Sequence, residues 1–98
     1  MKRVIVRYRV KPERVAENEE LVRAVYAELH EAAPDGLRYG TFRLEDGVSF
    51  VHVVIEHDVE NSDALTDVPA FQTFVSDIAD RCDVPPLAMG ATLVGGYR

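Results

Sequence analysis

Scarcity of several residue types narrows what this chain can be. Tryptophan is absent, and the one cysteine, Cys82, has no second cysteine with which to form a disulfide inside the chain. Proteins of oxidising compartments often depend on disulfides, so a single cysteine fits a reducing cytosol. The apolar run behind the basic N-terminus covers only residues 4–6, which is too short for a signal peptide or a membrane span. We therefore expect a cytoplasmic protein that does not enter a membrane.

Basic residues are also in short supply. The chain has 11 Lys and Arg against 17 Asp and Glu, which gives a formal net charge of -6. A net acidic surface repels nucleic acids and anionic lipids, so we expect neither as a partner. Hydrophobic residues make up 47% of the 98 residues, which is enough for one packed core. Residues 1–98 are therefore predicted to form a single domain.

The spacing of apolar residues predicts six elements. The order strand, helix, strand, strand, helix, strand is that of the ferredoxin-like βαββαβ fold, an α+β class with a four-stranded antiparallel sheet and both helices on one face. Pro12 would begin the first helix, Pro34-Asp35-Gly36 would end it, and Asp67 would cap the second helix. Strands are expected at residues 4–10, 37–44, 48–57 and 87–94, a turn at residues 45–47, and the second helix at residues 65–82.

The predicted sheet is apolar on both faces. In the third strand Phe50 and Val54 point to one side, whereas Val51 and Val53 point to the other. Two helices cover only one face, so the second apolar face needs another cover. A second copy of the chain would supply it by packing sheet against sheet, and we predict a homodimer. The alternative is that the third strand alone is buried on both sides and the rest of that face is wet.

Three segments carry a family likeness. Residues 6–12 lead from a strand into a Glu-rich helix, residues 50–56 form a long apolar strand, and Asp63-Ala64-Leu65 precedes a Phe-x-x-Phe motif at Phe71 and Phe74. With these segments, nearly the whole chain resembles the dimeric α/β-barrel superfamily, in particular small proteins similar to antibiotic-biosynthesis monooxygenases. The resemblance implies a ligand cleft between sheet and helices. Members of the superfamily include cofactor-independent oxygenases of polyketide-like phenols, haem-degrading enzymes, isomerases and proteins without known activity.

Two departures from the family pattern argue against haem degradation. The haem-degrading branch relies on a tryptophan near its haem, and this chain has none. The histidine often seen ahead of the Phe-x-x-Phe motif is replaced by Asp67-Val68-Pro69. No metal is expected either, because His52 and His57 lie an odd number of positions apart on one strand and so point to opposite faces. We therefore expect no cofactor.

His52 is the candidate catalytic residue. It lies among apolar residues of the third strand, where it would be either a core histidine satisfied by a hydrogen bond or a general base in the cleft wall. If residues 45–47 form a three-residue loop, Gly40 lies opposite His52 and leaves space above the imidazole. His57, beside an acidic loop, is expected to be solvated.

Arg7, Tyr8 and Tyr39 are the candidate substrate-binding residues. Arg7 would pair with an acid such as Glu56 or one of a partner subunit, or it would hold an anionic ligand. The tyrosines would bind a phenolic ligand or complete the core. Strand parity groups these residues by face, but it does not say which face the helices cover.

Two functions follow from these patterns. The first is a small-molecule-binding homodimer that resembles cofactor-independent monooxygenases of aromatic or polyketide-like compounds, in which His52 deprotonates the substrate. The alternative is a non-enzymatic small-molecule carrier or regulatory binding protein of the same fold. The sequence has no convergent set of acid, base and nucleophile, which favours the alternative.

Overall fold

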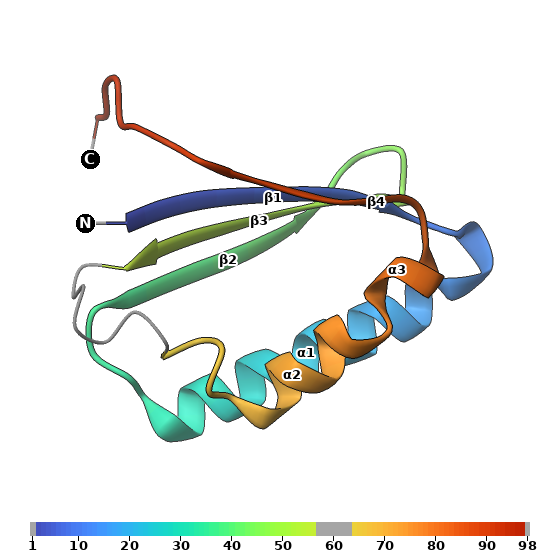
Figure 1. The fold of residues 1–98 in the computed structure, drawn as a ribbon, viewed down its shortest axis with the longest axis horizontal. Coiled ribbons are helices and arrows are strands. Elements are labelled where there is room, and N and C mark those ends of the chain that lie inside the picture. The colour runs from blue at the N-terminus through green and yellow to red at the C-terminus, as the bar shows by residue number, and fades with distance from the viewer. Residues whose placement is uncertain (1, 57–63, 98) are drawn as a thin grey trace.

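Four strands form one antiparallel sheet, and the helices lie along one face of it (Figure 1). The structure, a computed structural model, describes residues 2–56 and 64–97. The strand order is β2-β3-β1-β4, which confirms the predicted ferredoxin-like α+β fold. The strands are β1 (Lys2–Val10), β2 (Leu37–Arg43), β3 (Ser49–Glu56) and β4 (Cys82–Gly90), and the helices are η1 (Pro12–Arg14, a 3-10 helix), α1 (Val15–Ala32), α2 (Pro69–Ser76) and α3 (Ile78–Arg81).

Helix α1 forms because its apolar positions recur along one side. Asn18, Val22 and Val25 are buried at spacings of four and three residues, so they face the sheet together. The helix ends where Ala33 takes a left-handed conformation (φ 45°) and donates its N–H to the carbonyl of Leu29 at 2.7 Å. Pro34-Asp35-Gly36, which were predicted to end the helix, come immediately after Ala33.

The β2–β3 hairpin has a longer loop than predicted, and this shifts the strand register. Leu44 N–H bonds to the carbonyl of Ser49, so the loop covers residues 45–48 and includes Val48. Asp46 stabilises it by accepting the backbone N–H of Val48 at 3.0 Å and of Ser49 at 2.8 Å. The expectation that Gly40 lies opposite His52 is therefore wrong by one residue: Thr41 lies there.

Strand β4 begins at Cys82, five residues earlier than predicted, and ends at Gly90. Proline lacks the N–H of a strand ladder, so Pro85 and Pro86 predicted a loop, but β4 is an edge strand, where proline is tolerated. The second helix is also shorter than predicted. It breaks at Asp77, and its N-cap is Val68, so the predicted cap by Asp67 is wrong.

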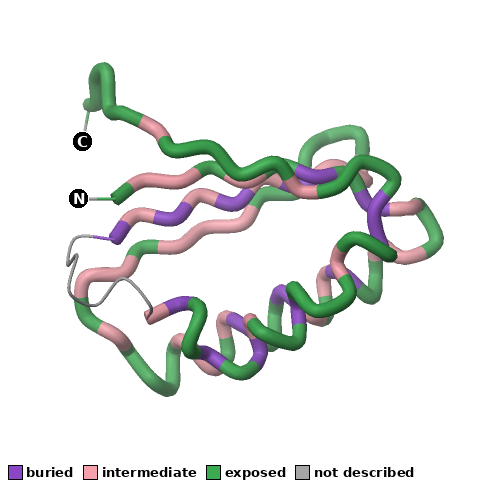
Figure 2. Tube along the Cα trace, viewed as in Figure 1, coloured by how far each residue is buried: buried purple, intermediate pink, exposed green. Residues whose placement is uncertain are grey.

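The core lies between the sheet and the helices. In Figure 2 buried positions alternate along β3 and line the sides of the helices that face the sheet, whereas β4 is almost wholly exposed. Even-numbered residues of β1 and β3 face the helices, which settles the question that strand parity left open. No helix in the described residues is both long and apolar enough to cross a membrane. His57 and the acidic loop after it lie outside the described residues.

Candidate functional site

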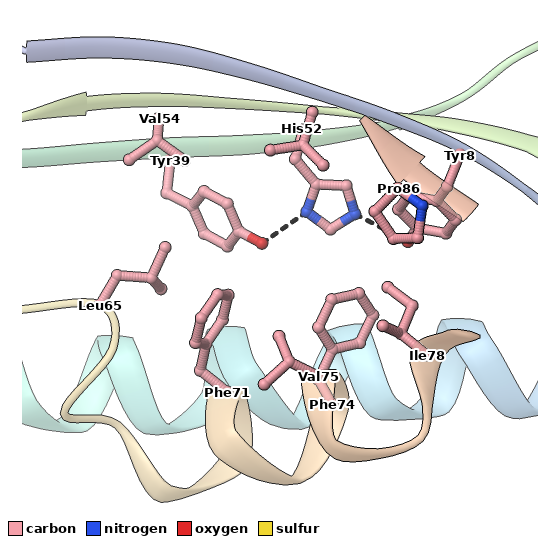
Figure 3. Close-up of a pocket in the computed structure, with 11 residues that line it drawn as sticks. Tyr8, Tyr39, His52, Val54, Leu65, Phe71, Phe74, Val75, Ile78 and Pro86 are labelled. Carbon is pink, nitrogen blue, oxygen red and sulfur yellow. Dashed lines mark hydrogen bonds between the residues drawn. The ribbon is translucent and has the colours of Figure 1, made fainter. Parts of the chain in front are cut away.

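An apolar pocket lies between the sheet and helix α2 (Figure 3). Its volume is about 190 Å³. Cavities of about 150 Å³ with apolar walls bind benzene, so this one admits a substituted aromatic ring. Val75, 43% exposed, marks its open side. Its walls are formed by Val6, Tyr8, Tyr39, His52, Val54 and Pro86 from the four strands and by Leu65, Phe71, Phe74, Val75 and Ile78 from the opposite side.

Three polar side chains converge at one place in this wall. The ring nitrogens of His52 lie 2.8 Å (Nε2) from the hydroxyl of Tyr8 and 2.5 Å (Nδ1) from the hydroxyl of Tyr39. Strand register explains the meeting, because Tyr8 pairs with Phe50 and Tyr39 with Val54, the residues two before and two after His52. Residues at such diagonal positions share a face and are within reach of long side chains.

Burial keeps all three groups uncharged at neutral pH. His52 is 3% exposed, and burial lowers the pKa of its imidazole to about 4. Burial also raises the pKa of the Tyr8 and Tyr39 hydroxyls well above the usual value for tyrosine. The site therefore presents a neutral imidazole between two protonated phenols.

A second row of buried polar groups stands behind Tyr8. Asn18 on α1 is fully buried and donates from Nδ2 to the Tyr8 hydroxyl at 3.0 Å. Arg81, also fully buried, donates from Nε to Oδ1 of Asn18 at 3.2 Å and from a terminal nitrogen to the carbonyl of Phe74 at 2.8 Å. Hydrogen bonds thus run without a gap from Arg81 to Tyr39.

Phe74 holds this assembly from the helix side. Its ring centroid lies 5.4 Å from that of His52 and 6.2 Å from that of Tyr8. The guanidinium carbon of Arg81 lies 5.2 Å from the same ring, within the range of a cation–π contact. One aromatic side chain of α2 therefore contacts Arg81, Tyr8 and His52.

The structure brings together three of the four predicted site residues. His52, Tyr8 and Tyr39 line one pocket, whereas Arg7 lies on the opposite face of the sheet, beside Leu87 of β4. The suggested pairing of Arg7 with Glu56 is wrong, because Glu56 is buried on the helix face.

Sequence reasoning missed Asn18, Thr41 and Arg81 as parts of this site. The signal for Asn18 was its place in the apolar stripe of the first helix, where a polar residue needs a buried partner. Thr41, whose Oγ1 is 3.3 Å from Nδ1 of His52, was hidden by the register error. Nothing in the sequence marked Arg81, because charged residues are rarely buried.

Tyr8, His52 and Tyr39 do not form an activated nucleophile. The pocket holds a weak base and hydrogen-bond donors, which can orient and polarise a bound oxygen atom. Within residues 2–56 and 64–97, no three His, Cys, Asp or Glu side chains cluster so that they could hold a metal ion. Binding and orientation are therefore the chemistry that the described groups supply.

Comparison by sequence gives no relative, because neither a family model nor a curated protein matches the chain. Comparison by structure does. A provisionally named antibiotic biosynthesis monooxygenase from Nitrosomonas europaea aligns with TM-score 0.78 and 18% identity, covering 97% of this chain and 100% of that one. Rv0793 from Mycobacterium tuberculosis aligns with TM-score 0.78 and 17% identity over 99% and 98% of the two chains.

A mutant of SnoaB, described as a cofactor-independent oxygenase from Streptomyces nogalater, also aligns. Its TM-score is 0.72 at 18% identity, with 97% of this chain and 94% of that chain covered. Identities this low establish the fold and not the reaction. From end to end, the chain has the fold of the antibiotic biosynthesis monooxygenase-like proteins.

Proposed function

We propose that this protein binds a small aromatic compound in the pocket and promotes its reaction with molecular oxygen without a cofactor. The observation that carries the proposal is the convergence of Tyr8, His52 and Tyr39 in an otherwise apolar wall. A pocket of this kind binds through its apolar surface and orients its ligand through a few polar groups. The fold shared with a cofactor-independent oxygenase adds support by analogy.

Pocket size sets the ligand class more narrowly than the sequence did. A volume of about 190 Å³ suits one ring with substituents. A second ring would extend past Val75 toward the open side, and a larger polyketide would project out of the chain. The ligand oxygen would lie against the Tyr39 hydroxyl, which Nδ1 of His52 holds in place.

The reaction needs only the substrate and oxygen. With 1-naphthol as substrate, the hydrogen para to the hydroxyl is replaced by one oxygen atom of O₂, and the other oxygen atom leaves as water. Naphthol and O₂ thus give 1,4-naphthoquinone and H₂O, with four electrons passing from the ring to oxygen. The protein would contribute orientation and stabilisation of the phenolate form, which is the form that reacts with oxygen.

A non-enzymatic carrier is the second candidate, and one observation favours it. An imidazole whose pKa is about 4 is a weak base at neutral pH, and both of its nitrogens are already hydrogen-bonded. A carrier would use the same pocket and the same hydroxyls without turnover.

Incubation with 1-naphthol under ¹⁸O₂ separates the two candidates. An oxygenase yields naphthoquinone that carries one ¹⁸O atom, measured by mass spectrometry, and His52→Gln lowers the rate at least tenfold while exposed His30→Gln leaves it unchanged. Saturable binding of 1-naphthol without quinone above the protein-free rate supports the carrier. Absence of binding rejects both.

We also propose that two copies of the chain associate through the open face of the sheet. That face carries exposed apolar side chains at Ile5, Phe42, Leu87 and Met89, which strand pairing places on the side opposite the helices. Leu87 is 55% exposed, and Val94 in the tail after β4 is 100% exposed. Apolar areas of this kind mark interaction surfaces.

A further inference from the structure

The hydrogen bonds behind the pocket have a fixed direction, and Arg81 sets it. A guanidinium can only donate, so the Asn18 oxygen must face Arg81 and the Asn18 amide nitrogen must face Tyr8. Because the Tyr8 oxygen accepts from Asn18, the Tyr8 proton is left for Nε2 of His52. A charged donor that cannot change its role thus orients the next two groups.

The same logic carries on to Tyr39. A neutral imidazole has one N–H, and since Nε2 accepts from Tyr8, the proton lies on Nδ1. Nδ1–H then donates to the Tyr39 oxygen, which frees the Tyr39 proton to point elsewhere. Within the chain Thr41 Oγ1 is an alternative partner for the Tyr39 hydroxyl, and it already lies 2.8 Å from the Tyr26 hydroxyl.

The positive charge of Arg81 behind the pocket also favours a ligand oxygen that accepts a hydrogen bond. In the described part of the chain, the side-chain hydrogen bonds of Arg81 reach only neutral oxygens, those of Asn18 and Phe74. Its positive charge is therefore not cancelled by a carboxylate in direct contact, although Glu17 on α1 and the thiol of Cys82 are near enough to feel it. A buried cation favours negative charge in the pocket in front of it.

We propose that the chain of hydrogen bonds from Arg81 through Asn18, Tyr8 and His52 to Tyr39, here called the relay, makes the pocket selective for an oxygen that accepts a hydrogen bond. Ligands of this class present a ketone, a quinone carbonyl or a phenolate. Asn18 and Arg81 are positioning residues, since they touch no ligand and act through Tyr8. The proposal rests on the proposed pocket function, and it means that a phenol enters as its phenolate instead of giving its proton to His52.

One substitution reverses the relay while keeping its shape. In Asn18→Asp the carboxylate accepts from Arg81 and also from the Tyr8 hydroxyl, so Tyr8 can no longer donate to His52. Nε2 then carries the imidazole proton, Nδ1 becomes the acceptor for Tyr39, and the pocket loses its free donor. Because the new carboxylate is paired with Arg81, this variant is expected to fold.

Nitrogen-15 NMR of the imidazole reads the direction of the relay without any ligand, and His52→Gln assigns the signals. The wild-type protein should show the Nδ1–H tautomer of His52, and Asn18→Asp should show Nε2–H. A wild-type Nε2–H tautomer, or a tautomer that the substitution leaves unchanged, overturns the relay.

Binding of a matched ligand pair tests the selectivity. Acetophenone and α-methylstyrene have the same shape, but only acetophenone has an acceptor oxygen. Acetophenone should bind the wild type roughly tenfold more tightly, and the ratio should fall toward one in Asn18→Asp, with α-methylstyrene still bound. Equal binding of both by the wild type rejects the selectivity and keeps the pocket. Binding of neither rejects the pocket function, while the NMR result still decides the direction of the relay.

Discussion

At the scale of single residues, burial of the His52 imidazole in an apolar wall destabilises its protonated form. Unfolded histidine titrates near pH 6.5, and burial lowers the pKa of His52 to about 4 in the folded chain. Between these values the unfolded chain binds the extra proton and the folded chain does not. His52 therefore stabilises the fold least at low pH, and its contribution recovers as pH rises past 6.5.

The first prediction follows from this loss of stability at low pH. As pH falls from 7 to 4, the free energy of unfolding of the wild type should decrease by roughly 3 kcal/mol more than that of His52→Gln. Urea titrations across this range measure the difference, in which shared effects such as those of Glu17 and Asp46 cancel. Parallel pH profiles of the two proteins would show that His52 is not held neutral.

Residue parity was a sound guide to part of the site. It placed Tyr8 on one face of β1, and the fold confirms that this face carries the pocket with His52 and Tyr39. The same parity puts Arg7 on the other face from Tyr8, but the sequence did not say which face the helices cover, so both residues were predicted to bind substrate. Arg81 could not be predicted, because its burial depends on a strand that begins earlier than the prolines suggested.

At the scale of elements, helix α2 decides whether the pocket exists. Phe71 and Phe74 project from it toward the sheet, as Figure 3 shows, and Phe74 is 3% exposed. Val75, the next residue along the helix, also lines the pocket but is 43% exposed.

Truncation of Phe74 is the second prediction. Phe74→Ala should destabilise the fold by about 3–5 kcal/mol, since it removes ring contacts with Tyr8 and His52 and opens a cavity. Val75→Ala on the next position should cost less than about 1 kcal/mol. Denaturant unfolding measures both, and equal losses would place the core contact of α2 elsewhere.

The wrong start predicted for the fourth strand shows what local sequence patterns cannot predict. A proline pair excludes a central strand, but it does not exclude an edge strand, and only the assembled sheet reveals that β4 is at the edge. The turn before β3 shows a similar limit. Its composition correctly predicted a hairpin, but the loop length, which the hydrogen bonds of Asp46 help to set, was predicted one residue too short. Element order could be predicted, whereas register could not.

At the scale of the whole molecule, the helices leave one face of the sheet uncovered. The third prediction is that the protein sediments as a dimer at micromolar concentration and that Leu87→Glu converts it to a monomer, because a charge within an apolar contact must be desolvated. Ala24→Glu, on the exposed surface of α1, should stay dimeric.

Circular dichroism of each variant confirms that the fold is kept. A wild-type protein that sediments as a single chain would contradict the dimer and leave the open face as an ordinary wet surface.

The location of the ligand is the claim on which the function depends, and methyl NMR during a titration with 1-naphthol tests it most directly. The account predicts saturable shifts at the methyl groups of Val6, Val54, Leu65 and Ile78, which line the pocket. The methyl groups of Ile5, Leu87 and Met89 on the open face should stay unchanged. Shifts confined to the open face, or no saturable shift at all, would contradict it.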